Sequence, residues 1–166
     1  MEKMEIRYKQ ASDDSYAISH VYEESWKHTY RGLLPQDFLD ELPKGHWCEL
    51  FDLPDWHTVV MTDGDEIIGS ALFCPSRFEA FKDYGEIVAI YLLPDYLHKG
   101  YGERLLDFVV QALRKLGYKK VFCYVLEGNE RARRFYGKQG FHNSGHKLVT
   151  DFAGQSICDL MYEKTL

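Results

Sequence analysis

The sequence predicts a single mixed α+β domain, residues 1–166, with a mostly antiparallel central sheet, one parallel strand–helix–strand crossover and flanking helices. Three observations predict this fold class. Apolar runs rich in β-branched residues recur along the chain. Segments with apolar residues at helical spacing lie between them. One of these segments joins the strand-like runs 85–93 and 119–127, and such a connection normally makes a right-handed crossover between parallel strands.

The first part of the chain predicts a short strand followed by two helices. Residues 4–9 alternate between apolar and charged side chains, which favours a strand. Ser12 is the expected N-cap of a helix that ends near Tyr30, because acidic residues and then an apolar stripe follow it. Pro35 begins a second helical stretch. Residues 47–54 are compatible with either a short helix or a loop.

The middle of the chain is rich in strand signals. Residues 57–73 hold two β-like runs around the Asp-Gly turn at 63–66, which predicts an antiparallel hairpin. After a polar loop, residues 85–93 form a third apolar run that Pro94 ends.

The last part of the chain alternates between helix and strand. Residues 101–116 place their apolar side chains on one helical face, and Gly117 closes that helix. After the strand at 119–127, Asn129 is the expected cap of a helix that Gly140 ends. The tail that follows, up to the C-terminus, alternates weakly and predicts a hairpin that turns near residues 151–154.

Charge and hydropathy exclude two kinds of partner. The net charge of −6 argues against nucleic acid, because phosphate binding requires a basic face. No apolar run approaches the roughly 20 residues that span a bilayer, so no membrane is expected. Residues 1–5 lack the apolar core of a secretory signal, which indicates a cytoplasmic location.

Cysteine and histidine usage predicts neither a zinc site nor a redox site. The four cysteines form no C-x-x-C pair, and they are expected to be buried free thiols. His142 and His146 have no third ligand nearby in the sequence, so no metal is assigned.

The acidic average hides a basic segment. Residues 98–138 contain ten Lys or Arg and four Asp or Glu, a net charge of +6, whereas the rest of the chain carries −12. Such a segment is either a set of solvated helix faces or a local anion-binding site. Charge alone does not decide between the two.

The stretch LPDYLHKGYGERLL, residues 93–106, puts a glycine-rich turn between a strand and the start of a helix. Free backbone N–H groups and the helix dipole make this a generic anion site. A Walker loop would need G-x-x-x-x-G-K-[ST], which is absent. A dinucleotide-binding loop would need a third glycine where Leu105 stands, and only one crossover unit is present.

The segment EIVAIYLLPDYLHKGYGERLLDFVVQAL, together with NERARRFYGKQGF, resembles the GCN5-related N-acetyltransferase (GNAT) superfamily. In that family a strand leads into [RQ]-x-x-G-x-[GA] at a helix start, and N-x-x-A-x-x-F-Y-x-x-x-G-F follows. The second motif is complete between Asn129 and Phe141. The first departs at Leu97, where Arg or Gln is usual, so the loop is expected to bind phosphate by backbone more than by side chain.

The resemblance implies the GNAT fold and acetyl-CoA as co-substrate. The basic segment then coincides with the stretch expected to meet the phosphates of coenzyme A, with Arg133, Arg134 and Lys138 as further basic candidates. The residues implied to bind acetyl-CoA lie on the strand, the glycine loop and the later helix: Ile90, Tyr91, Leu92, His98, Lys99, Gly100, Tyr101, Gly102, Glu103, Asn129, Ala132, Phe135 and Tyr136.

The resemblance also implies direct attack of an amine on the thioester, with no acyl-enzyme. Tyr136 occupies the family position of the acid that protonates the departing sulfur, with Phe135 expected toward the packed face and Tyr136 toward the cleft. Glu86 is a candidate general base, and a water chain is the alternative. A strand amide near residues 90–92 is the expected oxyanion donor.

The acceptor is expected to be a small-molecule amine, with polyamine-like amines favoured. Trp26, Tyr30 and Arg31 are the candidate acceptor-binding residues, in a string that is similar to the first-helix region of GNATs acting on small amines. Acetylation of a protein N-terminus or lysine is an alternative, as is a non-catalytic domain that binds acyl-CoA. A homodimer through the late strands is possible within the family.

Overall fold

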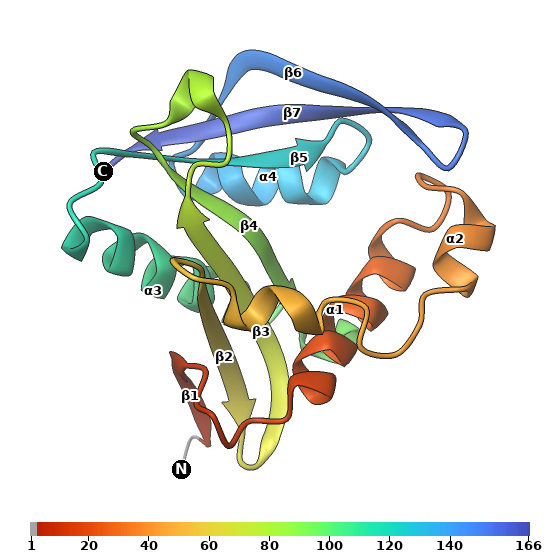
Figure 1. Cartoon of the computed structure of the whole chain (residues 1–166), viewed down its shortest axis with the longest axis vertical. Coiled ribbons are helices and arrows are strands. Elements are labelled where there is room, and N and C mark those ends of the chain that lie inside the picture. The colour runs from red at the N-terminus through yellow and green to blue at the C-terminus, as the bar shows by residue number, and fades with distance from the viewer. Residues whose placement is uncertain (1–2) are drawn as a thin grey trace.

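Seven strands form one sheet in the order β1-β2-β3-β4-β5-β7-β6 in the computed structural model, which describes residues 3–166 (Figure 1). All neighbouring strands are antiparallel except β4 and β5, which run parallel. The predicted mixed sheet with one parallel pair is therefore confirmed. The strands are β1 (Met4–Tyr8), β2 (His57–Asp63), β3 (Glu66–Pro75), β4 (Gly85–Leu92), β5 (Lys120–Leu126), β6 (His142–Phe152) and β7 (Gln155–Thr165).

Four α-helices flank this sheet in the described part of the chain, at the places that the sequence predicts. They are α1 (Ser15–Thr29), α2 (Gln36–Asp40), α3 (Tyr101–Lys115) and α4 (Glu130–Lys138). The stretch that the sequence left open contains a short 3-10 helix, Cys48–Asp52. As predicted, Asn129 caps α4, because its side-chain oxygen accepts a hydrogen bond from the backbone N–H of Ala132 at 3.2 Å.

The start of α1 differs from the prediction. Asp14 is the N-cap, and its side chain accepts the N–H of Tyr16 at 2.9 Å. Ser12 lies outside the helix, in a turn that is held to β1 by a hydrogen-bonded ion pair. Asp13 accepts two hydrogen bonds from Arg7 of β1, at 2.8 and 2.9 Å, which fixes the chain between the first strand and α1. The same contact lowers the pKa of Asp13 to about 2.

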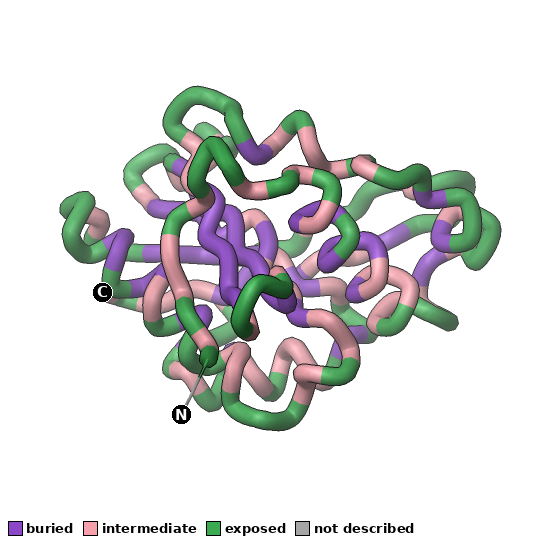
Figure 2. Tube along the Cα trace, turned by 90° about the horizontal axis from the view of Figure 1, so that it is seen from below, coloured by how far each residue is buried: buried purple, intermediate pink, exposed green. Residues whose placement is uncertain are grey.

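The core lies on both faces of the sheet, because alternate strand residues point to opposite sides. On one face Val60 and Leu72 pack against α1, and on the other Val59 and Ala71 pack against α3. Figure 2 shows the buried stretches running through the central strands while the turns remain exposed. The sheet, packed on both faces, thus supports the residues of the functional site.

The cysteines and the helices also bear on the sequence predictions. All four cysteines are free thiols, as predicted. Only Cys74 and Cys123 are buried, whereas Cys48 and Cys158 are partly exposed. Within residues 3–166, no helix has the length and the apolar character that a membrane crossing requires.

Candidate functional site

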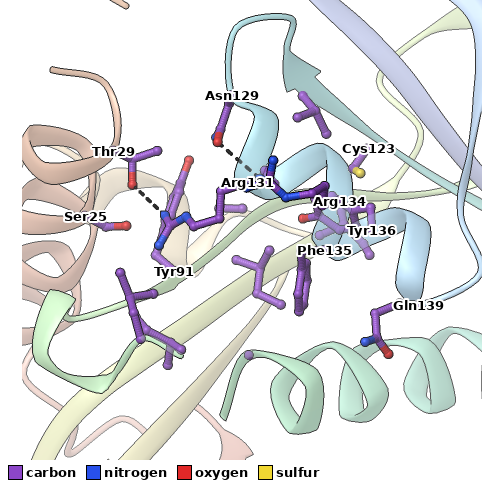
Figure 3. A pocket seen from close by; sticks show the side chains of 18 of the residues that line it. Ser25, Thr29, Tyr91, Cys123, Asn129, Arg131, Arg134, Phe135, Tyr136 and Gln139 are labelled. Carbon is purple, nitrogen blue, oxygen red and sulfur yellow. Dashed lines mark hydrogen bonds between the residues drawn. The ribbon is translucent and has the colours of Figure 1, made fainter. Parts of the chain in front are cut away.

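A cavity of about 460 Å³ opens where β4 and β5 separate. Its walls come from the end of α1, the two strands, the loop before α3, and α4 (Figure 3). Its lining combines apolar strand side chains with a few polar and basic groups from the helices. A cavity of this size and mixed lining is typical of small-ligand sites.

The separation of the two strands creates the cavity. β4 and β5 pair only at Gly85 with Val121 and at Glu86 with Phe122. A bulge in the pairing of β3 with β4 then leaves Val88 without a partner in the register. Beyond this point the edge of β4 that faces β5 has no strand partner among the described residues. Its free N–H and C=O groups can bind an extended ligand as an additional strand would.

The glycine loop presents backbone donors at one end of this cavity. Gly100 has a left-handed conformation (φ 85°) and is the N-cap of α3, with no side chain capping the helix. His98 also has a positive φ of 62°. The first amides of α3 therefore remain free, at the positive end of a fifteen-residue helix. This is the arrangement that binds phosphate groups.

Gly102 lies where the start of α3 faces Phe135 of α4. A Cβ atom at Gly102 would lie 3.5 Å from the Phe135 ring, and both residues line the cavity. A larger side chain at this position would occupy space that a ligand reaching the loop would need.

Most of the predicted cofactor-binding residues line the cavity. They are Ile90, Tyr91, Leu92, His98, Gly100, Gly102, Glu103, Asn129, Ala132, Phe135 and Tyr136. Lys99 and Tyr101 do not line it. The ammonium of Lys99 lies 5.9 Å from the centre of the Tyr96 ring, and Tyr101 packs near the same ring. Both side chains therefore face away from the cavity.

Tyr136 lies deep in the cavity, next to Cys123 (Figure 3). Burial raises the pKa of Tyr136 well above its usual range, and the neighbouring Cys123 thiol adds to this effect. The phenol therefore stays protonated. Tyr136 lines the cavity as expected, but Phe135 lines it too instead of facing only the packed side, and Tyr136, only 6% exposed, is the more buried of the two.

Glu86 does not line the cavity, although its neighbour Ile87 does. Its side chain is 1% exposed and is held by Arg77. Arg77 donates its backbone N–H to Oε1 at 3.0 Å and its Nη2 to Oε2 at 2.6 Å. The carboxylate thus fastens the loop between β3 and β4 to the sheet.

The three predicted acceptor residues lie in different surroundings. Tyr30 lines the cavity. Trp26 lies behind the lining, where its Nε1 donates to the hydroxyl of Tyr91 at 3.0 Å. Burial raises the pKa of both Tyr30 and Tyr91. Arg31 is exposed, outside the cavity.

The basic residues of α4 divide into two groups. Arg131, Arg134 and Lys138 line the cavity. Arg133 points elsewhere, because its Nε donates to the hydroxyl of Tyr162 at 3.1 Å. Arg131 reaches across to α1, where its Nη2 donates to Oγ1 of Thr29 at 3.2 Å (Figure 3).

Several lining residues were not identified from the sequence. Ser25 and Thr29 sit on the last turns of α1, and Cys123 and Tyr124 on β5. Their spacing within each element is ordinary. Only the strand alternation of 119–127 could have indicated which β5 side chains share a face.

The comparisons with known proteins agree with this geometry. The sequence matches the model of the acetyltransferase (GNAT) family over residues 17–141. It is 29% identical over 119 residues to an uncharacterized N-acetyltransferase, YuaI, of Bacillus subtilis, covering 70% of this chain and 69% of that protein. It is 27% identical over 145 residues to a spermidine N(1)-acetyltransferase of Thermoplasma acidophilum, covering 83% and 88%.

A solved structure shows the same fold over nearly the whole chain. The PaiA N-acetyltransferase of Thermoplasma acidophilum, in complex with coenzyme A, superposes with a TM-score of 0.74. The two chains are 25% identical, and the match covers 98% of this chain and 99% of that one.

Proposed function

Because the chain belongs to the GNAT family of acetyltransferases, we propose that it transfers the acetyl group of acetyl-CoA to a primary amine of a small molecule, with polyamine-like amines favoured, in the cavity between β4 and β5. One observation carries this proposal. The cavity joins the uncapped start of α3 at one end to the protonated hydroxyl of Tyr136 deep inside. The N–H groups that can bind phosphate and the acid that can protonate the leaving sulfur thus lie in the same cavity.

The described residues fit acetyl-CoA as substrate. The free amides of α3 and the left-handed turn at Gly100 suit the pyrophosphate. The open edge of β4 suits the amide groups of the pantetheine arm, and it offers backbone N–H groups at residues 90–92 to a developing oxyanion. Arg134 and Lys138 supply positive charge beside the same cavity. The thioester sulfur would then lie near Tyr136.

The reaction needs an acid for the sulfur and an acceptor for the ammonium proton. Tyr136 gives its proton to the departing thiolate, which makes the sulfur a better leaving group. For the amine proton, the contacts of Glu86 with Arg77 favour an anchoring role over the expected role as base. We therefore assign the amine proton to water in the cavity.

Glu86→Gln separates these two roles. We expect the variant to keep the shape of the pH profile of kcat/KM and to lose about 1–3 kcal/mol of unfolding free energy, because the buried contact with Arg77 weakens. The measurements are pH–rate profiles and denaturant unfolding. Glu79→Gln, an exposed carboxylate of the same loop, is the matched control and should change neither. A displaced acid limb of the Glu86→Gln profile would restore Glu86 as the base.

Arg134 and Lys138 should act on the phosphates of the donor. We expect the double variant Arg134→Gln, Lys138→Gln to raise KM for acetyl-CoA about tenfold at low salt and less at high salt, because exposed charges are screened. KM for S-acetylpantetheine, which carries no phosphate, should stay unchanged. Arg114→Gln with Lys119→Gln removes two exposed charges outside the cavity and is the control. An equal rise in KM for both donors would contradict the assignment.

A screen of amines of different sizes tests which acceptor the protein uses. The relative from Thermoplasma acidophilum is named as a spermidine acetyltransferase, which supports a small amine with more than one nitrogen. Alkylamines, diamines, polyamines, amino acids and lysine-containing peptides are each mixed with acetyl-CoA, and thiol release is followed. We expect turnover on small amines. Turnover on peptides alone would favour a protein acetyltransferase. Binding of acetyl-CoA without turnover on any amine would favour a non-catalytic domain.

A further inference from the structure

Asp159 lies on the sheet face that carries the end of α1, next to the cavity lining but not part of it. It is on β7, where it pairs with Leu126 of β5 in the register. Paired residues share a face, and Leu126 packs against the same apolar cluster as Trp26 and Tyr30 at the end of α1. Ile157, two residues earlier on the same face of β7, belongs to that cluster too. Asp159 therefore faces the end of α1 and not α3 and α4.

Tyrosine side chains that line the cavity lie near this carboxylate. Tyr124 is its diagonal neighbour across β5 and β7. Tyr30 and Tyr91, also in the lining, respond to its negative charge, which contributes to the raised pKa of each. The carboxylate is thus close to the aromatic wall of the cavity on the α1 side.

Asp159 has no cationic partner in the described part of the chain. No ion pair or hydrogen bond involves its side chain there. Burial raises its pKa, and no nearby positive charge offsets that effect. A half-buried carboxylate without a cation is unfavourable in the empty protein. An ammonium bound beside it would favour its ionised form.

Asp159 also lies away from the reacting centre. Tyr136 contacts Cys123, whereas Asp159 is level with Leu126, three residues further along β5. That is about 10 Å along the strand. The two side chains also sit on opposite faces of the sheet. The gap between β4 and β5, which begins where their pairing ends after Glu86 and Phe122, connects the two faces of the sheet.

We propose that Asp159 binds a second ammonium group of the acceptor, so that the enzyme selects aliphatic diamines and longer polyamines over monoamines. This inference rests on the proposed function and adds a specificity residue to it. The aromatic side chains of Tyr30 and Tyr124 favour the cation and its methylene groups. The second nitrogen stays charged beside Asp159, while the first passes between the strands as a neutral amine and reaches the thioester.

The test compares pairs of amines that differ in one nitrogen. The probes are diaminohexane against hexylamine, and diaminooctane against octylamine, because these diamines are long enough to reach from the reacting centre toward Asp159; kcat/KM is measured at saturating acetyl-CoA. We expect the natural enzyme to prefer each diamine by about tenfold or more. Asp159→Asn should remove that preference, lowering kcat/KM for the diamines about ten- to a hundredfold and leaving the monoamines within about twofold. Asp151→Asn, an exposed carboxylate of the same hairpin, should match the natural enzyme.

An undiminished diamine preference in Asp159→Asn, or no preference in the natural enzyme, would overturn the role of Asp159. An equal loss for diamines and monoamines would assign Asp159 to structure instead. If the natural enzyme binds acetyl-CoA and acetylates none of the amines, the proposed function itself fails, which is a different result from any of these.

Discussion

Replacing Tyr136 with Phe is expected to lower kcat by roughly 10- to 1000-fold, with little change in KM for acetyl-CoA. The substitution keeps the buried ring and removes only the hydroxyl that faces Cys123. The leaving thiolate then has no acid, whereas the binding surface for the donor is unchanged. The measurement is steady-state kinetics with thiol detection, on an amine that the natural enzyme accepts.

Tyr162→Phe is the matched control for this result. Tyr162 is also a buried tyrosine with one hydrogen bond, from Arg133, but it does not line the cavity. We expect its kcat to stay within about twofold of the natural enzyme. Since burial keeps the pKa of Tyr136 high, its ionisation should not lower activity at neutral or mildly alkaline pH. Full activity of Tyr136→Phe would remove the residue from the acid role.

The second large effect is expected at the glycine loop. Gly102→Val should raise the Kd for coenzyme A roughly a hundredfold, because the branched side chain hinders the close approach of phosphate to the free amides. A Cβ at Gly102 meets the Phe135 ring at an ordinary contact distance of 3.5 Å, but the two methyl groups of valine extend beyond it, so the stability of the variant is measured alongside its affinity. Calorimetric titration with coenzyme A, together with the melting temperature, measures both effects.

Gly137→Val controls for a valine in a helix. Gly137 is exposed on α4, and a Cβ there would meet nothing within 4 Å. It should bind coenzyme A as the natural protein does. Unchanged affinity in Gly102→Val would show that the phosphates do not lie against the start of α3.

Much of this fold could be predicted because its signals are local. Apolar alternation marks β4 and β5, and helical spacing marks α3. Gly100 and Asn129 begin α3 and α4 as their backbone and capping chemistry require. These positions frame the cavity, so most residues expected to contact acetyl-CoA indeed line it.

The remaining site could not be predicted because it depends on contacts distant in sequence. Arg131 meets Thr29 only because the fold brings the start of α4 within reach of the end of α1, 102 residues earlier in the chain. The Arg77 side chain engages Glu86 through a loop whose path no periodicity describes. The position of Asp159 near the proposed acceptor site depends on the register in which β7 pairs with β5. The N-cap of α1 is Asp14 and not the predicted Ser12, because Arg7 of β1 holds the turn before the helix.

Direct transfer of the acetyl group from acetyl-CoA to the amine requires that no side chain of the cavity is acetylated on the way. The buried thiol of Cys123 lines the cavity beside Tyr136, so an acetylated Cys123 is the competing route. The enzyme is mixed rapidly with acetyl-CoA alone and then with an accepted amine, while free thiol and the mass of the protein are followed. We predict no thiol and no acetylated protein before the amine, and equal amounts of thiol and acetamide after it. A burst of thiol matching the enzyme concentration without amine, with one acetyl group on the protein, would contradict direct transfer.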